Sequence, residues 1–383
     1  MVGAVRAGTS LRQVARDYGV SLLTVQRWVA RAGSQRLDRV NWDDRSSAPA
    51  TVQRTAPEIE QRVIAVRHRL REESPLGEYG AVAIHRTLAA DGVGPLPAVR
   101  TIHRILERHD LLDRPRRPRR TPPPVGWYLP RVAAGDAELD LVDLVEGLVI
   151  KAGPELEVLT AISLHGGLAA AWPLVGIHAS DVVTALTAHW QAVGRPAYVQ
   201  FDNDTRFSGP HQHPDVVGRV MRLCLSLEIV PVFVPPREYG FQAAIESLNG
   251  RWQAKVWSRF EHRTLADLHT RSTAYISASR QRHARRIEAA PARRPIPASW
   301  QLDLQAAPVG RLVFLRRIDP AGGISVLGRT YPIAGSQPHR LVRVEVDLDA
   351  GRLQVYQLRR RTPFDQPLLH EQPYQLPQRR FRD

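Results

Sequence analysis

The stretch that decides the fold is LDLVD at residues 139–143, an apolar run that carries two carboxylates, Asp140 and Asp143. A second apolar run, YVQF at residues 198–201, leads directly into Asp202. Short apolar runs of this kind predict buried strands. A carboxylate on a buried strand is costly unless something offsets its desolvation, and divalent cations that serve phosphoryl transfer do so. The two stretches therefore predict strands that carry acidic side chains to a metal site.

A third carboxylate, Glu246, lies in a segment that predicts a helix over residues 243–260. The apolar residues of this helix recur at helical spacing and predict its buried face: Ile245, Leu248, Trp252 and Val256. Glu246 falls on the neighbouring stripe together with Asn249, so it can reach carboxylates on the strands. A lone acidic residue on a helix is usually only solvated. Glu246 therefore gains its meaning from Asp140 and Asp202.

Strands and helices follow one another outward from these stretches. Three strands are predicted first, joined by short polar or glycine turns, at residues 139–149, 156–163 and 168–177. A helix capped at Ser180 comes next. After it we expect a strand, a helix, a strand and the Glu246 helix, at residues 197–201, 215–227, 230–234 and 243–260. The pattern predicts an α/β domain.

The order strand-Asp, strand-Asp-Asn, helix-Glu resembles the DDE core shared by retroviral integrases and many bacterial insertion-sequence transposases. The likeness includes FDN at residues 201–203 and the spacing from Glu246 to Asn249, and it covers roughly residues 130 to 290. Asp204 stands where the family usually has glycine. The 44 residues from Asp202 to Glu246 (246 − 202) exceed the usual spacing by several, and a breaker-rich loop at 208–214 can hold the excess. The family's Asn-Gly before the glutamate is replaced by YGFQ at 239–242.

The resemblance implies a ribonuclease-H-like catalytic core at residues 131–298 that cleaves and transfers DNA strands with two divalent cations, Mg²⁺ or Mn²⁺. Asp140 would bridge both ions, Asp202 would hold one and Glu246 the other. Asp143 and Asp204 are the alternatives for the first two positions, since each lies within three residues of them. By the same likeness, DNA ends would contact three side chains near the metal site: Asn249, Arg251 and Lys255. Plain solvation is the alternative for the two basic ones.

The charge of the chain supports a nucleic-acid partner. Its 383 residues carry a net charge of +15, and the sequence pI is about 10.9. Lys151 and Lys255 are the only lysines among 53 basic residues, so 51 are arginines, whose planar fork suits phosphates and guanine edges. Genome base composition can produce the same bias, and membrane-surface or ribosome-associated proteins are also basic. A hydrophobic content of 43% is sufficient for two to four folded domains.

Several kinds of site and location are excluded or disfavoured. Cys224 is the only cysteine, so the chain has no internal disulfide and we expect a reducing compartment. The histidines lack the paired-cysteine spacing of a structural zinc site. No stretch approaches the roughly 20 apolar residues of a membrane span, and no signal sequence is evident. We therefore expect a cytoplasmic bacterial protein that works at the nucleoid.

Residues 1–45 predict a helix-turn-helix domain. Ser10 and Ser21 are placed to cap two helices that Gly19 separates. The small core is predicted from their apolar positions: Leu11, Val14, Ala15, Val20, Val25 and Trp28. Three polar side chains near the start of the second helix are the expected base contacts: Thr24, Gln26 and Arg27. A generic helical hairpin is the alternative.

Residues 55–113 predict a second helix-turn-helix or winged-type helical domain. Its helices are expected at residues 58–71, 81–88 and from Pro97 onward. On the third helix one face opposes the apolar positions and would bind DNA: Arg100, His103 and Arg104. A merely solvated face is the alternative. A basic, proline-rich linker is predicted at 114–130, with arginines that would follow phosphates: Arg116, Arg117, Arg119 and Arg120.

The segment after the core predicts a small β-barrel at residues 305–358, built from five short strands with turn signals between them. DNA binding, subunit contact and passive stabilisation are the functions open to it. The remaining residues, 359–383, predict an extended basic tail.

Taken together, the fold class is multidomain α/β and the function is that of a DDE transposase or integrase that binds element ends and target DNA. An inert or domesticated DNA-binding repressor and a ribonuclease-H-like nuclease are the alternatives. Two DNA ends acted on by two active sites imply at least a dimer, and a tetramer is equally natural. The sequence leaves room for an accessory protein.

Overall fold

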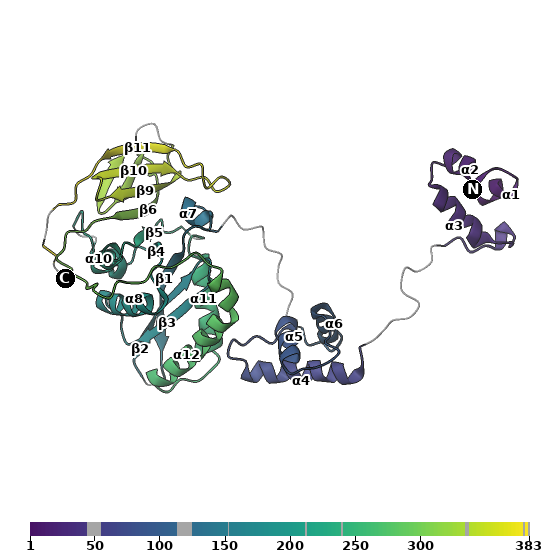
Figure 1. Ribbon diagram of the computed structural model, residues 1–383, viewed down its shortest axis with the longest axis horizontal. Coiled ribbons are helices and arrows are strands. Elements are labelled where there is room, and N and C mark those ends of the chain that lie inside the picture. Colours follow the sequence, from purple (N-terminus) through teal and green to yellow (C-terminus); the bar gives the residue numbers. More distant parts are fainter. Residues whose placement is uncertain are drawn as a thin grey trace. The chain divides into compact units, whose positions relative to one another are not determined.

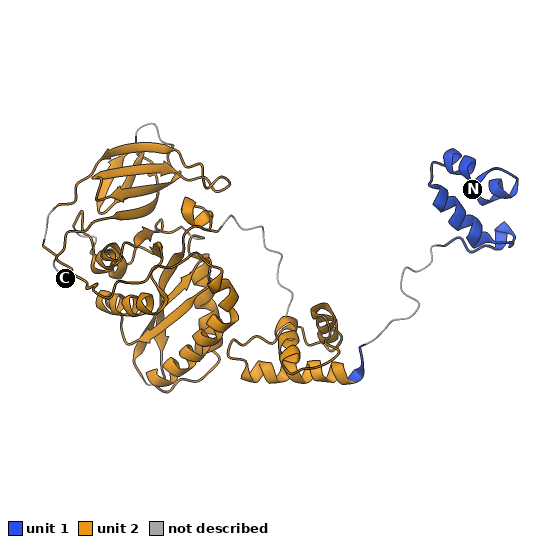
Figure 2. Ribbon diagram, in the orientation of Figure 1, with its two compact units in different colours: residues 1–57 blue, residues 58–383 orange. Residues whose placement is uncertain are grey.

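The structure is a computed structural model that describes residues 1–43, 55–112, 125–151, 153–210, 213–238, 240–333, 337–377 and 380–381. The chain forms two compact units, Met1–Pro57 and Glu58–Asp383 (Figure 2). The four arginines of the predicted linker lie outside the described residues: Arg116, Arg117, Arg119 and Arg120. Part of the predicted linker is not linker at all, because Trp127, Tyr128 and Leu129 are buried in the core of the second unit.

The first unit contains the two predicted helices and their caps. Its elements are α1 Val2–Arg6, α2 Leu11–Asp17, α3 Leu22–Ala32 and the 3-10 turn η1 Leu37–Arg39. The hydroxyl of Ser10 accepts the Gln13 backbone N–H, and that of Ser21 accepts the Thr24 N–H, as predicted. Val14 and Val25 are fully buried between the helices. DNA reading by this unit stays a prediction.

The second unit begins with three helices around a small apolar core. They are α4 Pro57–Glu73, α5 Ala81–Ala90 and α6 Val99–Arg108. Ile84, Leu88 and Ile102 are fully buried at their centre. The predicted helices are therefore present, and α6 turns Ile102, Ile105 and Leu106 inward. Val99 was predicted on this inner face but is exposed.

A mixed sheet forms the centre of the second unit (Figure 1). Its first five strands are β1 Leu139–Val149, β2 Glu155–Ser163, β3 Ala169–Leu174, β4 Tyr198–Phe201 and β5 Val230–Phe233. β2 runs antiparallel to β1 and β3 antiparallel to β2, whereas β4 pairs parallel with β1 and β5 parallel with β4. The predicted α/β class is confirmed, and β1 has the predicted bounds.

Helices cover both faces of this sheet. They are α7 Pro130–Ala133, α8 Ala179–Val193, α9 Thr205–Ser208, α10 Arg219–Ser226, α11 Ala243–Trp252, α12 Leu265–Arg282 and α13 Ala284–Glu288. Val142 of β1 packs in one apolar core with Trp190 of α8. Leu141, its neighbour in the strand, packs in another with Ile245 of α11. The face that a β1 side chain takes therefore decides which helix it meets.

Some helix bounds differ from the predicted ones. α8 is capped by a box of His178 and Asp181 and not by Ser180. The predicted helix 215–227 is shorter, because α10 begins at Arg219. The helix of Glu246 changes after Trp252 into a π-helical turn, η2 Gln253–Trp257.

The C-terminal strands continue the same sheet. They are β6 Arg311–Arg317, β7 Gly323–Val326, β8 Arg329–Pro332, β9 Leu341–Asp347, β10 Arg352–Gln357 and β11 Leu368–Pro373. β6 pairs parallel with β5, and Phe314 stacks on Phe233 with ring centroids 5.3 Å apart. The described strands thus form a nine-stranded sheet and a separate β7–β8 hairpin. The predicted small β-barrel at 305–358 is not confirmed, because its strands β6, β9 and β10 extend the central sheet, and β11 lies in the predicted tail.

Within the described ranges, no helix is long and apolar enough to cross a membrane.

Candidate active site

The register of β1 against β4 brings two carboxylates side by side. Leu141 pairs with Gln200 in the parallel ladder. Two residues further along the chain stand Asp143, in β1, and Asp202, directly after β4, and the period of two places both on the face that packs against α11. Leu141 and Leu139 of β1 belong to the apolar core on that face.

Asp143 is held by a series of side-chain hydrogen bonds that runs across the sheet. Asn249 of α11 donates its Nδ2 to Asp143 Oδ2 at 2.9 Å, and its own Oδ1 accepts the Thr160 hydroxyl of β2 at 2.7 Å. Burial, together with the negative charges of Asp202 and Glu246, raises the pKa of Asp143 to about 6 against opposing hydrogen bonds. Both other carboxylates are therefore close enough to act on its charge.

Asp202 lies in a tight turn at the end of β4. Its Oδ1 accepts the backbone N–H of Asp204 at 2.9 Å. Burial raises its pKa, and the Asp204 carboxylate adds to the rise. Asp204 itself caps α9 and binds Arg206, with Oδ2 and Nη2 2.7 Å apart. The Asp204 carboxylate is therefore bonded within the turn. Asp202 remains the acidic group at the end of β4 that faces the site.

Glu246 stands in the first turn of α11 and is exposed. Among the described residues its side chain has no hydrogen bond and no ion pair. Ile245 and Leu248, its neighbours on the helix, are buried in the core and fix the rotation of α11. The carboxylate of Glu246 is thus presented toward solvent on the side of Asp143.

Asp140 does not join this group, which corrects the prediction for the first carboxylate. Its side chain points to the other face of the sheet, toward α8, and is only 2% exposed. Arg293 donates Nη1 to Oδ1 at 2.9 Å and Nη2 to Oδ2 at 2.5 Å, and the indole N–H of Trp190 lies 3.0 Å from Oδ2. Asp140 therefore fastens the segment after α13 to the core. Because side chains alternate along β1, Asp143 occupies the position on the α11 face that was predicted for Asp140.

The donor set on the α11 face fits a hard divalent cation. Three carboxylates are the ligands that Mg²⁺ and Mn²⁺ prefer. The pKa of Asp143 is raised mainly by its burial, and the negative charges of Asp202 and Glu246 add to the rise. In the part of the chain that the structure describes, no three acidic, histidine or cysteine side chains stand at metal-binding separations. Closure of the set around an ion would need a movement of these side chains.

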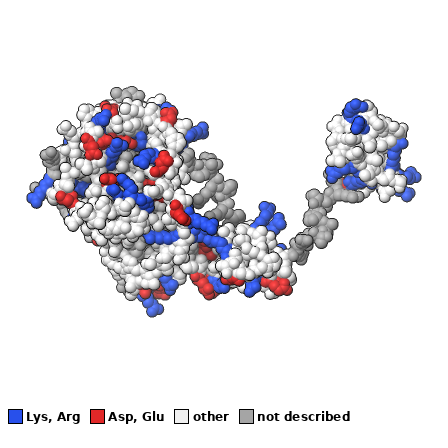
Figure 3. All heavy atoms as spheres, viewed as in Figure 1, with Lys and Arg blue, Asp and Glu red and all other residues white. Residues whose placement is uncertain are grey.

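A large basic groove lies between the α4–α6 helices and the core. Its volume is about 1330 Å³, and it brings together residues of both parts: Arg100, His103, Arg104, Arg251, Lys255 and Arg282. Five of these were predicted DNA contacts, and Arg282 was not. Glu78 and Glu107 are its acidic members. Figure 3 shows basic side chains gathered on this part of the surface.

Hydrogen bonds join the helical domain to the core beside this groove. Lys255 donates to the Gly77 carbonyl at 3.3 Å and lies over the Tyr79 ring. Arg259 donates to the Ser74 carbonyl at 2.6 Å. Lys255 is therefore half-buried and already hydrogen-bonded within the protein. Arg251, Arg100 and Arg104, by contrast, are exposed. Asn249, also predicted to touch DNA, is buried and holds Asp143 instead.

The remaining predicted DNA contacts belong to the first unit. Gln26 and Arg27 are exposed on α3, and Thr24 is half-buried with its hydroxyl 2.8 Å from that of Ser21. Sequence reasoning missed α12, which supplies Arg282 and covers the α11 side of the sheet. The sequence signal that could have predicted the start of α12 is the capping box formed by Thr264 and Asp267.

No protein-family model and no curated protein matches the chain. Among solved structures, a chain of the simian T-cell lymphotropic virus intasome in complex with PP2A regulatory subunit B56 gamma is 14% identical, with a TM-score of 0.33, and covers 71% of this chain and 87% of that chain. The catalytic core domain of BIV integrase is 16% identical (TM-score 0.27; 37% of this chain, 81% of that chain). The HTLV-2 integrase catalytic core domain in complex with magnesium is 13% identical (TM-score 0.27; 37% and 83%). TM-scores below 0.5 do not establish a shared fold.

Proposed function

We propose that the protein is a polynucleotidyl transferase of the DDE type, a transposase or integrase that cleaves DNA and joins DNA strands. The observation that carries the proposal is that Asp202 and Glu246 lie close enough to Asp143, on the α11 face of the sheet, for their charges to raise its pKa. Asp143 replaces Asp140 in this set, because Asp140 is neutralised by Arg293 on the other face. The core would be ribonuclease-H-like.

The three carboxylates would hold two divalent cations, Mg²⁺ or Mn²⁺. Bound there, the cations supply activation of the attacking hydroxyl and neutralisation of charge on the phosphoryl group. Asn249 and Thr160 keep Asp143 turned toward that position through their hydrogen bonds. Nucleophile and leaving group are both oxygen atoms in such a transfer, so no covalent bond to the protein is required.

DNA would lie in the basic groove. α11 carries Glu246 in its first turn and Arg251 in its last turn. A DNA strand with one phosphate bound at Arg251 would therefore extend along this helix toward the carboxylates. Arg100, Arg104 and Arg282 would contact further phosphates. The first unit would read sequence through Thr24, Gln26 and Arg27. The linker arginines would follow the backbone between these sites.

The second candidate is a DNA-binding repressor with an inert core. It is favoured by the absence, among the described residues, of three side chains already at metal-binding separations. A ribonuclease-H-like nuclease would use the same carboxylates, but the two helical domains before the core favour a protein that recognises chosen DNA sites.

One assay separates the three functions. Wild type and Asp202→Asn are incubated with labelled element ends, target plasmid and Mg²⁺, Mn²⁺ or EDTA. Metal-dependent joined product from wild type alone establishes the transferase. Tight binding without cleavage establishes the repressor, and cleaved ends that are never joined establish the nuclease.

We further propose that the working form is at least a dimer, because two DNA ends require two active sites. A tetramer or an accessory protein fits the same scheme. The proposed location is the cytoplasm, at the nucleoid.

A further inference from the structure

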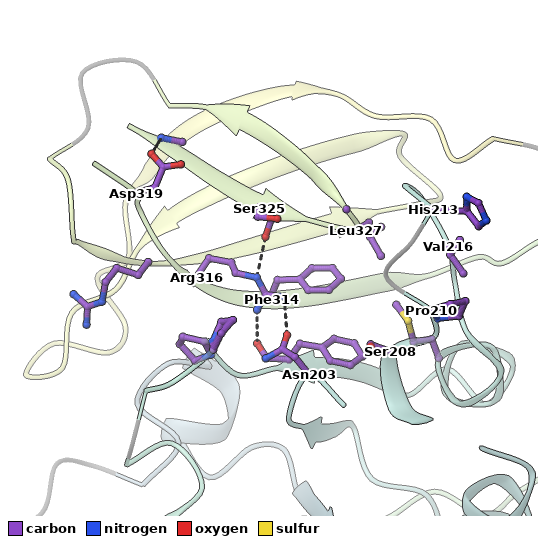
Figure 4. A pocket seen from close by; sticks show the side chains of 17 residues that line it. Asn203, Ser208, Pro210, His213, Val216, Phe314, Arg316, Asp319, Ser325 and Leu327 are labelled. Atoms are coloured by element: carbon purple, nitrogen blue, oxygen red, sulfur yellow. Dashed lines mark hydrogen bonds between the residues drawn. The ribbon is translucent and has the colours of Figure 1, made fainter. Parts of the chain in front are cut away.

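A second cavity, separate from the basic groove, opens between the end of β4 and the C-terminal strands. Its volume is about 620 Å³, within the ~300–1,000 Å³ typical of small-ligand sites. Its walls are largely apolar and include Phe314, Phe233, Met221 and Pro236. Figure 4 shows Arg316 and Asn203 together at its floor, joined by a hydrogen bond. Asn203, one of its lining residues, follows Asp202 directly in the chain.

Arg316 of β6 is bound by neutral groups. Its Nη2 donates to Asn203 Oδ1 at 3.0 Å and its Nε to the Ser325 carbonyl at 2.9 Å, while its Nη1 donates to the Leu315 carbonyl at 2.9 Å and to the Val234 carbonyl at 3.2 Å. Among the described residues it forms no salt bridge. The only carboxylate that lines the cavity there is Asp319, which accepts the Gly323 N–H at 2.7 Å and lies apart from Arg316 in Figure 4.

A buried cation with neutral partners keeps most of its electrostatic cost. Burial lowers the pKa of Arg316 to about 10, and no neighbouring charge opposes the effect. Two other arginines that are shielded from solvent differ in this respect, because Arg293 is paired with Asp140, and Arg206 with Asp204, Glu146 and Glu157. An anion that enters the cavity would supply what Arg316 lacks.

We propose that this cavity binds one unpaired nucleotide of the DNA, with its phosphate on Arg316 and its base against the apolar wall. A guanidinium attracts a phosphate through its charge, and Nη2 of Arg316 has one N–H besides the one that it donates to Asn203. The apolar lining would pack against the base. The cavity is far too small for a duplex, so only a nucleotide taken out of the stack can enter. The choice of DNA as the source of the phosphate rests on the proposed function.

Binding here would also act on the active site. Arg316 holds Asn203 Oδ1, while Asn203 Nδ2 donates to the Val234 carbonyl at 2.7 Å. A phosphate on Arg316 would therefore be fixed one residue away from Asp202. The scissile strand could be positioned by a neighbouring nucleotide held in this cavity.

The first test measures thermal stability of the full chain without divalent cation, in dAMP, inorganic phosphate or deoxyadenosine at matched ionic strength. A ligand that binds the folded state raises Tm. We expect dAMP to raise Tm at lower concentration than phosphate, and deoxyadenosine to have no effect. In Arg316→Gln the dAMP concentration needed should rise about tenfold or more. Arg222→Gln is the matched control, because Arg222 also bonds only to carbonyls but does not line the cavity.

A second variant keeps the proposal testable if Arg316→Gln does not fold. Val216 lines the cavity and is half-buried, so Val216→Trp should fill it without touching the bonds of Arg316, and should abolish the dAMP effect. The proposal is overturned if wild type gives no rise with dAMP, if phosphate acts as strongly as dAMP, or if either folded variant responds like wild type.

A DNA arm identifies the source of the nucleotide. Wild type should bind a duplex with a single-stranded overhang more tightly than a blunt duplex, and Arg316→Gln should lose the preference while keeping its blunt-duplex affinity. Equal preference in both proteins rejects DNA as the source. Neither arm depends on cleavage, so a failure of strand transfer in wild type would refute the proposed function without deciding this result.

Discussion

Asp140 and Asp143 differ in function because successive side chains of a strand point to opposite faces. Asp140 meets Arg293 and Trp190 on the α8 side, where a hydrogen-bonded ion pair offsets its burial. Asp143 meets Asn249 and the charges of Asp202 and Glu246 on the α11 side. Three residues of sequence separate a structural carboxylate from a proposed catalytic one.

Asn249 tests how Asp143 is positioned. Asn249→Ala removes the N–H donor to Asp143 and the acceptor of the Thr160 hydroxyl. Loss of such a supporting partner typically costs 10–100-fold in metal affinity or activity, so strand transfer should fall by about that factor. Because Asn249 is buried, DNA affinity measured by anisotropy should stay unchanged. A large loss of DNA affinity would restore the original prediction that Asn249 contacts DNA.

His189 of α8 predicts a dependence of stability on pH. Burial lowers its pKa to about 4, with Arg293 and Arg280 adding to the effect and Asp140 opposing it. The unfolded chain takes up this proton near pH 6.5 and the folded chain only near pH 4. Stability should therefore fall as pH drops through this window, by about 3 kcal/mol at most.

The measurement for His189 is denaturant unfolding at several pH values between 7 and 4, comparing wild type with His189→Gln. The variant has no proton to take up at this position, so its stability curve should be flatter over the window. Parallel curves would show that folding does not lower the pKa of His189.

At the residue scale, the sequence could point to Asp202 and Glu246 as candidates but could not choose between Asp140 and Asp143. Both lie on the same apolar run, and strand period alone does not say which face meets which helix. The deciding partners, Trp190 and Arg293, are 50 and 153 residues from Asp140. Only the packing of α8 and α11 on opposite faces resolves the choice.

At the scale of elements, α11 links the two proposed sites. Glu246 stands in its first turn, Asn249 turns inward to Asp143, and Arg251 ends it at the basic groove. The π-helical turn that follows carries Lys255 to the Gly77 carbonyl. One helix therefore connects the carboxylates to the second helical domain.

The cap of α3 gives a prediction for the first unit. The Ser21 hydroxyl accepts the Thr24 N–H at 3.1 Å, so Ser21→Ala should destabilise α3 by about 0.5–2 kcal/mol. Hydrogen exchange of the α3 amides in the full chain measures the effect. Ser34→Ala, at an exposed turn after α3, is the control and should leave exchange unchanged. Equal exchange in both variants would show that the cap contributes nothing.

Elements with strong local signals could be predicted, and those that depend on distant partners could not. Ser10 and Ser21 mark helix starts through local hydrogen bonds, and β1 is bounded by its own apolar run. α12 is rich in serine, threonine and arginine, so its apolar stripe is weak. β6 reads as the start of a new domain, but its pairing with β5 depends on contacts between Val232 and Val313, 81 residues apart.

At the scale of the whole molecule, the excess positive charge should make DNA binding strongly dependent on salt. Arg100 and Arg104 are exposed in the groove, so the double variant Arg100→Gln, Arg104→Gln should lose two phosphate contacts. Each contact contributes about 0.9 to the slope of log K against log salt, so the slope should fall by roughly 1.8. Arg108→Gln is the control on the same helix, because Arg108 pairs with Glu60 outside the groove. An unchanged slope in the double variant would exclude the groove as the DNA path.

The central claim is that Asp143, and not Asp140, completes the catalytic set. The direct measurement is metal-dependent strand transfer by Asp143→Asn, Asp140→Asn and the double variant Asp140→Leu, Arg293→Met, each with its unfolding free energy. Asp143→Asn should fold and lose activity about a thousandfold or more. Asp140→Asn should lose about 3–5 kcal/mol of stability yet stay active in its folded fraction, and the double variant should recover stability. Full activity in Asp143→Asn, with folded but inactive Asp140 variants, would contradict the claim.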